Sequence, residues 1–144
     1  MRLFGHPVHP MLVAFPIGLL ALTPVWDGLA WASVLGDGRT LAYYSEAAGL
    51  AMAGLAIIAG FADFMKIPES ESANVKAALV HAGLALCMVS LFGVAFALRG
   101  GLAGRPSPLV LLLEALGALC LGVTGWFGGD LVFRRGVGVE TKSG

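Results

Sequence analysis

Four long apolar segments constrain the fold of this chain more than any other feature of its sequence. They cover about residues 11–35, 41–64, 75–98 and 109–127, and short polar breaks separate them. Each is close to the ~20 residues that a helix needs to cross the hydrocarbon core of a bilayer. Because a spanning segment must satisfy its own backbone polar groups, the sequence predicts an all-α protein, a four-helix transmembrane bundle with up-down-up-down topology.

The composition favours an integral membrane protein with one domain. Of the 144 residues, 58% are hydrophobic and 12% are charged, whereas about 25% are charged in a typical soluble domain. The formal net charge is +0, so no basic field attracts nucleic acid. We expect a single membrane domain over residues 1–144, with the lipid bilayer as its partner and a tail, 128–144, outside the spans.

The first apolar segment has a second interpretation. Met-Arg, an apolar run and "AWA" at 30–32 are similar to a secretory signal peptide with its cleavage site. The prolines Pro16 and Pro24 and the acidic Asp27 interrupt the run, which is also longer than the ~7–15-residue core of such a signal. A transmembrane helix is therefore the preferred interpretation.

The lysine and arginine side chains predict the orientation of the bundle. The side with both chain ends and the second loop carries six of them: Arg2, Lys66, Lys76, Arg134, Arg135 and Lys142. The other side carries three: Arg39, Arg99 and Arg105. Because these cations are enriched in cytoplasmic loops, we expect a plasma-membrane protein with both termini in the cytoplasm.

All three histidines of the chain fall near the same end of the predicted bundle. His6 and His9 precede the first span, His81 lies one to two turns into the third, and Asp63 lies at the end of the second. Each of the first two histidines precedes a proline, which disfavours helical geometry. Pro10 suits the first position of a helix, with His9 as its cap. His81 is then expected about one turn deeper in the membrane than His9.

Three interpretations of these histidines remain open. The first is a mononuclear iron, zinc or copper site built from His6, His9, His81 and Asp63, because imidazole is the commonest metal ligand and a carboxylate completes such sites. The second is a haem b with His9 and His81 as axial ligands, although the expected difference in depth opposes it. The third is structural: the histidines hydrogen-bond helix ends and hold no ligand.

A second group of ionisable residues lies toward the opposite end. Asp27, Glu46 and Glu114 fall near the ends of the first, second and fourth spans. Charged residues inside a span are costly and usually find partners in the bundle. A salt bridge, with Arg39 as the available cation, is the favoured interpretation. A proton or cation path toward the histidines is the alternative.

Four stretches of the chain resemble an uncharacterised bacterial family of membrane proteins, catalogued as a domain of unknown function. They are "GHPVHPMLVAFPIGLL" at 5–20, "GFADFMKIP" at 60–68, "HAGLAL" at 81–86 and "GGDLVFRRGVGV" at 128–139. The positions that match the family pattern are His6, Pro7, His9, Pro10, Pro16, Asp27, Asp63, His81, Gly128, Gly129 and Gly136. Relatives often carry asparagine where this chain has Gly83 or Ala85, which weakens the argument for a tightly tuned site.

The resemblance implies a four-helix protein of the bacterial inner membrane. Relatives are sometimes fused to Rieske-type iron–sulfur domains, which implies an electron-transfer setting and a redox partner protein. We therefore expect haem or a transition metal at the histidines. A non-catalytic assembly subunit and a small ion or proton pathway are the alternatives. The resemblance also brings in the tail: Gly128 and Gly129 are expected to end the fourth helix, so that the tail can fold over the histidines as a lid.

Overall fold

The computed structural model describes residues 2–3, 6–102 and 105–137, with side chains from Val8 onward. Four helices long and apolar enough to cross a membrane lie in these ranges. The first span combines two helices, α1 and α2, and the last continues from α5 into a short π-helix, η1. Their bounds are α1 Val8–Leu12, α2 Ala14–Trp31, α3 Gly38–Phe64, α4 Ser72–Leu98, α5 Pro108–Gly129 and η1 Asp130–Arg134.

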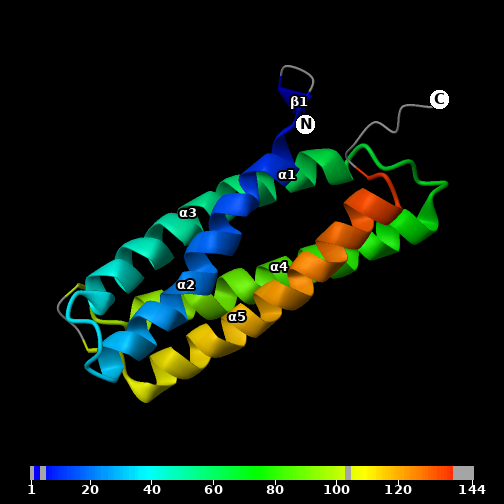
Figure 1. Cartoon of the computed structure of the whole chain (residues 1–144). Coiled ribbons are helices and arrows are strands. Elements are labelled where there is room, and N and C mark those ends of the chain that lie inside the picture. Colours follow the sequence, from blue (N-terminus) through cyan, green and yellow to red (C-terminus); the bar gives the residue numbers. More distant parts are fainter. Residues whose placement is uncertain (1, 4–5, 103–104, 138–144) are drawn as a thin grey trace.

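The helices run alternately up and down, which confirms the predicted all-α transmembrane bundle (Figure 1). One end of the bundle carries α1, the loop between α3 and α4, and the start of the tail. The opposite end carries the loops from α2 to α3 and from α4 to α5. We call them the histidine end and the arginine end, after the side chains described below. Before α1, the strands β1 (Arg2–Leu3) and β2 (His6–Pro7) pair antiparallel.

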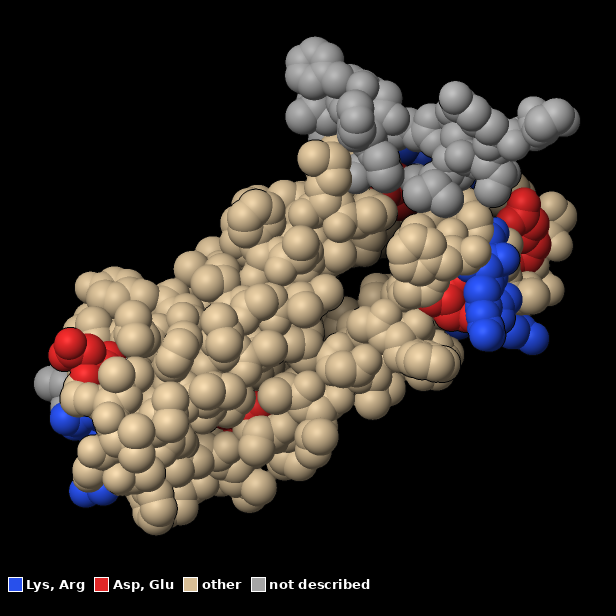
Figure 2. Space-filling model, in the orientation of Figure 1, with Lys and Arg blue, Asp and Glu red and all other residues tan. Residues whose placement is uncertain are grey.

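The surface has the distribution of a membrane protein. Charged atoms gather at the two ends of the molecule, and the belt between them is almost free of charge (Figure 2). Large apolar side chains on this belt are exposed, including Leu55, Ile58 and Leu119. Since lipid tails are themselves apolar, the bundle core is small: Leu20, Met88, Phe92 and Leu121 form its centre. Close backbone packing replaces much of the hydrophobic drive.

The prolines of the first span act differently from the prediction. His9 is helical rather than a cap, because α1 starts at Val8 and the His9 carbonyl accepts a helical hydrogen bond from Val13 N at 3.1 Å. Pro10 lies in the first turn of α1, where its missing N–H leaves no bond unmade. The break between α1 and α2 follows from Pro16, which has no N–H to donate to the Leu12 carbonyl.

The two halves of the chain are an internal repeat. Helices α1, α2 and α3 form one hairpin, and α4 and α5 form the other. Leu20 and Phe92 occupy equivalent places, both 0% exposed, as do Ala42 and Val110. A Cβ on Gly49 would lie 2.7 Å from Leu20, and one on the equivalent Gly117 would lie 2.8 Å from Phe92. Because both hairpins start at the histidine end, the repeat axis runs along the bundle.

This packing predicts different outcomes for two glycines of the same helix. Gly117→Ala drives a methyl group into the buried Phe92 ring and should destabilise the protein by about 1–3 kcal/mol, the usual cost of overpacking. Gly122→Ala is the control, because nothing lies within 4 Å of its Cβ position. It should stabilise the helix by up to about 1 kcal/mol. Unfolding in detergent measures both, and equal effects would contradict the assigned contact.

Candidate functional site

His9 is held against α3 by one hydrogen bond and one glycine. Its Nδ1 lies 2.8 Å from the carbonyl oxygen of Ala56. One turn further along α3, a Cβ on Gly60 would lie 2.9 Å from Cε1 of the imidazole. The ring therefore packs directly on the helix backbone, and only glycine leaves room for it there.

His81 repeats this arrangement in the second hairpin. Its Nδ1 lies 3.1 Å from the carbonyl oxygen of Thr124 on α5. A Cβ on Gly128 would lie 2.9 Å from Cε1 of its ring. Gly128 thus makes space for a histidine. The prediction that Gly128 and Gly129 end the fourth helix is wrong, because α5 runs through Gly129 and continues as η1. The positive φ in this region belongs to Gly136, at 65°.

The two imidazole rings are neighbours in an edge-to-face arrangement. Their centroids lie 6.3 Å apart and their planes cross at 80°. The expected depth difference between His9 and His81 is therefore wrong. It assumed that His9 precedes the first helix, whereas α1 places His9 level with the inner turns of α4. This expected difference in depth was the main argument against a haem held by both His9 and His81, and the structure does not support it.

The hydrogen bonds define the protonation of each ring. A backbone carbonyl oxygen can only accept, so Nδ1 of both His9 and His81 carries the hydrogen and donates it. The neutral tautomer with a proton on Nδ1 leaves the lone pair on Nε2. A carbonyl partner on the far nitrogen is the usual arrangement for a metal-ligating histidine, because it orients the ring and increases its basicity. In this tautomer each ring has an Nε2 lone pair that could bind a metal ion.

A cavity of about 280 Å³ lies against the two rings. Its walls are largely apolar and come from every helix at this end; Ile57, Phe64, Ala82, Leu131, Val132 and Val137 contribute. Exposed side chains such as Phe61 and Leu79 also line it, so it opens sideways toward lipid. The space-filling view is hollowed between α1 and α5 (Figure 2). Leu131, Val132 and Val137 of the tail line this cavity, and the lid itself stays a prediction.

Asp63 also lines this cavity, near its edge. Its Oδ1 lies 3.6 Å from Nζ of Lys66, one turn further on. Among the residues whose side chains are described, no group of three or more histidine, cysteine, aspartate or glutamate residues is arranged to hold a metal ion. The side chain of His6 lies outside the described part, so the site with His6, His9, Asp63 and His81 stays a prediction.

The arginine end contains a buried ionic cluster. Arg99, directly after α4, contacts acids from the three other spans: its Nε lies 3.0 Å from Glu46, and its Nη2 lies 2.5 Å from both Asp27 and Glu114. All three acids are 0% exposed. Arg99 therefore takes the place proposed for Arg39, which lines a separate pocket. The sequence analysis treated Arg99 as a loop cation because helix α4 ends only one residue before it.

Each acid of this cluster uses only one oxygen for the arginine. The second oxygens, Oδ1 of Asp27, Oε1 of Glu46 and Oε2 of Glu114, are buried and have no hydrogen-bond partner in the described part of the chain. One guanidinium cannot balance three carboxylates in a low-dielectric interior, where uncompensated charge is costly. The cluster therefore has both the excess acid groups and the unpartnered oxygens of a site that retains protons.

The pairing of functional residues follows the internal repeat, which the sequence analysis missed. His9 and His81 are equivalent, and so are Asp27 and Arg99, which are 72 residues apart. Glu46 matches Glu114, and Gly60 matches Gly128. A signal was present: "EAAGLAMAG" at 46–54 and "EALGALCLG" at 114–122 share their Glu-Ala-x-Gly and final glycine. Self-comparison of the two halves finds this pattern.

Comparisons with known proteins agree with the fold. A family model described as "Predicted membrane protein (DUF2231)" matches residues 5–141, nearly the whole chain. No curated protein and no solved structure matches the sequence. The family description assigns no activity, so the functional argument rests on the site itself.

The repeat predicts that Asp27 and Arg99 can exchange places. Asp27→Arg places two guanidinium groups side by side and Arg99→Asp leaves four acids without a cation, so each should cost about 3–5 kcal/mol. The double variant restores one guanidinium and three acids at equivalent positions, and it should recover most of the lost stability. Thermal unfolding in detergent tests this as a double-mutant cycle. A double variant as unstable as the sum of the single ones would contradict the symmetric arrangement.

Proposed function

We propose that this chain, which belongs to the family of predicted membrane proteins designated DUF2231, binds one haem b through His9 and His81 in an electron-transfer role. When bound, the haem supplies a one-electron redox centre inside the membrane. The protein is then a small haem-carrying membrane subunit that exchanges electrons with a redox partner.

The separation of the two imidazole rings carries this proposal. With a metal–nitrogen bond of about 2.0–2.1 Å and about 1.2 Å from a ring nitrogen to its ring centre, two imidazoles that held one metal ion from opposite sides would have centroids about 6.4 Å apart. The separation between His9 and His81 is 6.3 Å. The rotation of one ring relative to the other, 80° here, is free in such an arrangement. Among the described side chains no third ligand accompanies these two histidines, which would suit a haem better than a mononuclear site.

The surroundings of the rings support the same proposal. The carbonyl of Ala56 accepts a hydrogen bond from Nδ1 of His9, and the carbonyl of Thr124 accepts one from Nδ1 of His81. Both bonds favour the tautomer whose Nε2 lone pair can bind a metal. Gly60 and Gly128 allow each ring to lie against a helix, which restricts its rotation. The cavity of about 280 Å³ is just below the usual range for organic ligands, so a macrocycle would extend through the lateral opening. Its apolar walls exclude water and suit a macrocycle.

The expected orientation gains support from the ionic cluster. Arg99 is buried among acids, so it no longer counts as a loop cation. The comparison becomes six cations at the histidine end against Arg39 and Arg105 at the other, a stronger bias than before. We propose that the protein lies in the bacterial inner membrane with the histidine end at the cytoplasmic side. A redox partner then meets the haem from the cytoplasm or within the lipid.

Absorption spectroscopy of the purified protein, expressed with sufficient haem, tests the ligand assignment. The wild type should contain about one haem per chain and show the spectrum of six-coordinate low-spin haem b. His9→Ala and His81→Ala should each lose that spectrum, because each removes one axial ligand. His6→Ala is the control: it should keep the haem, since His6 is a ligand only in the mononuclear alternative.

Two results would reject haem binding. One is folded wild-type protein that incorporates no haem, which favours the structural interpretation or an assembly role. The other is about one equivalent of iron, zinc or copper without a haem spectrum, lost in His6→Ala and Asp63→Asn. Elemental analysis distinguishes these two outcomes.

A second function is favoured by the unpartnered oxygens of Asp27, Glu46 and Glu114. We infer that the cluster around Arg99 holds protons and exchanges them with the solvent at the arginine end. Two retained protons make the cluster neutral. A path that continues to the histidines is the ion-pathway hypothesis stated above, and it requires groups that shuttle protons along the bundle.

Proton flux in liposomes tests this pathway. Glu114→Gln removes a titratable group and keeps the size of the side chain, so it should reduce proton flux strongly if protons cross the bundle by this route. Glu71→Gln, in the exposed loop before α4, is the control and should leave the flux unchanged. Identical flux in Glu114→Gln and wild type removes the pathway hypothesis.

A further inference from the structure

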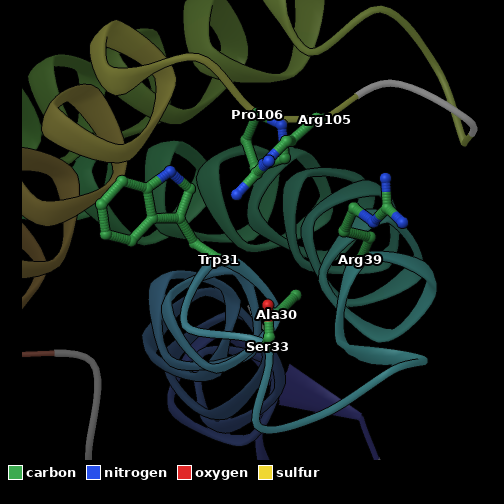
Figure 3. A pocket seen from close by; sticks show the side chains of 6 residues that line it. All are labelled: Ala30, Trp31, Ser33, Arg39, Arg105 and Pro106. Carbon is green, nitrogen blue, oxygen red and sulfur yellow. The ribbon is translucent and has the colours of Figure 1, made fainter.

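A basic pocket lies at the arginine end, apart from both the ionic cluster and the histidines. It has a volume of about 210 Å³ and is lined by Ala30, Trp31, Ser33, Arg39, Arg105 and Pro106. Arg39 comes from the first turn of α3, and Arg105 comes from the loop before α5 (Figure 3). The pocket therefore joins the two hairpins at the membrane boundary.

The pocket is built for an anion. No acidic side chain lines it, and within the described residues neither Arg39 nor Arg105 makes an ion pair, since Arg99 takes the nearby acids. The helices α3 and α5 both begin at this end, so their N-terminal dipoles add positive potential. Among the described residues, the charged side chains that line the pocket are thus those of Arg39 and Arg105.

The position of the pocket in the membrane identifies the source of the anion. Trp31 is the last residue of α2, and its side chain is 53% exposed. Tryptophan at the end of a span belongs to the interfacial belt, level with lipid headgroups. Exposed apolar side chains, Val34 and Leu109 among them, lie at the same end. A phosphate at this depth is most simply the phosphate of a lipid.

We propose that this pocket binds the phosphate group of a phospholipid, held by Arg39 and Arg105, with Trp31 against the glycerol region. Guanidinium groups bind phosphate oxygens with paired hydrogen bonds, which suits a fixed headgroup. The lipid joins the start of α3 to the loop between α4 and α5, so it ties the two hairpins together at the end where α2 and α4 stop. It acts independently of any haem.

Thermal unfolding of the detergent-purified chain, titrated with short-chain phosphatidylglycerol, tests the site. Phosphatidylglycerol should raise the melting temperature of the wild type in a saturable way. In Arg39→Gln/Arg105→Gln the apparent Kd for phosphatidylglycerol should rise by about 10- to 30-fold, because two interfacial cations are lost. Arg134→Gln/Arg135→Gln, a matched pair at the histidine end, should bind as the wild type does.

Two comparison ligands complete the experiment. Diacylglycerol of the same chain length lacks the phosphate and should give no saturable shift. Inorganic phosphate lacks the chains and should act only at far higher concentration. Equal phosphatidylglycerol binding by both double-arginine variants, or equal effects of diacylglycerol, would overturn the site. An equal effect of inorganic phosphate would overturn its assignment to a lipid.

Discussion

The contacts of Arg99 hold the arginine end of the bundle together. Its guanidinium follows α4 and reaches Asp27 on α2, Glu46 on α3 and Glu114 on α5, so one side chain touches all four spans. Apolar packing cannot supply this selectivity in a membrane, because lipid tails are as apolar as the core side chains. A buried charge accepts only partners that neutralise it, which specifies both the order and the register of the helices.

The internal repeat explains why functional side chains meet on the bundle axis. Residues on equivalent faces of the two hairpins converge there, so one histidine per hairpin yields a neighbouring pair. The histidine end keeps this symmetry: each ring has its own carbonyl and its own glycine. The arginine end breaks it, because Asp27 in one hairpin corresponds to Arg99 in the other. A symmetric acid pair there would leave the cluster without a cation.

The sequence predicted the architecture and the end at which the histidines gather, because hydropathy and chain length impose both. It did not predict what depends on contacts between helices. The proline rules placed His9 outside the helix, whereas its bond to Ala56 and its contact with Gly60 belong to tertiary packing. The role of Gly128 was missed for the same reason. Arg99 stood next to a loop and was counted as exposed, since only the packed bundle reveals three acids around it.

Under the proposed function, His9 and His81 would be the two residues that hold the haem. Electron paramagnetic resonance of the oxidised protein tests this most directly, because the signal reports the axial ligands and the angle between their planes. Two imidazoles crossed at 80° predict a low-spin signal of the strongly anisotropic type that near-perpendicular bis-histidine haems give. A high-spin haem signal would contradict haem binding by both histidines. So would the absence of any haem signal from folded protein that has been supplied with excess haem.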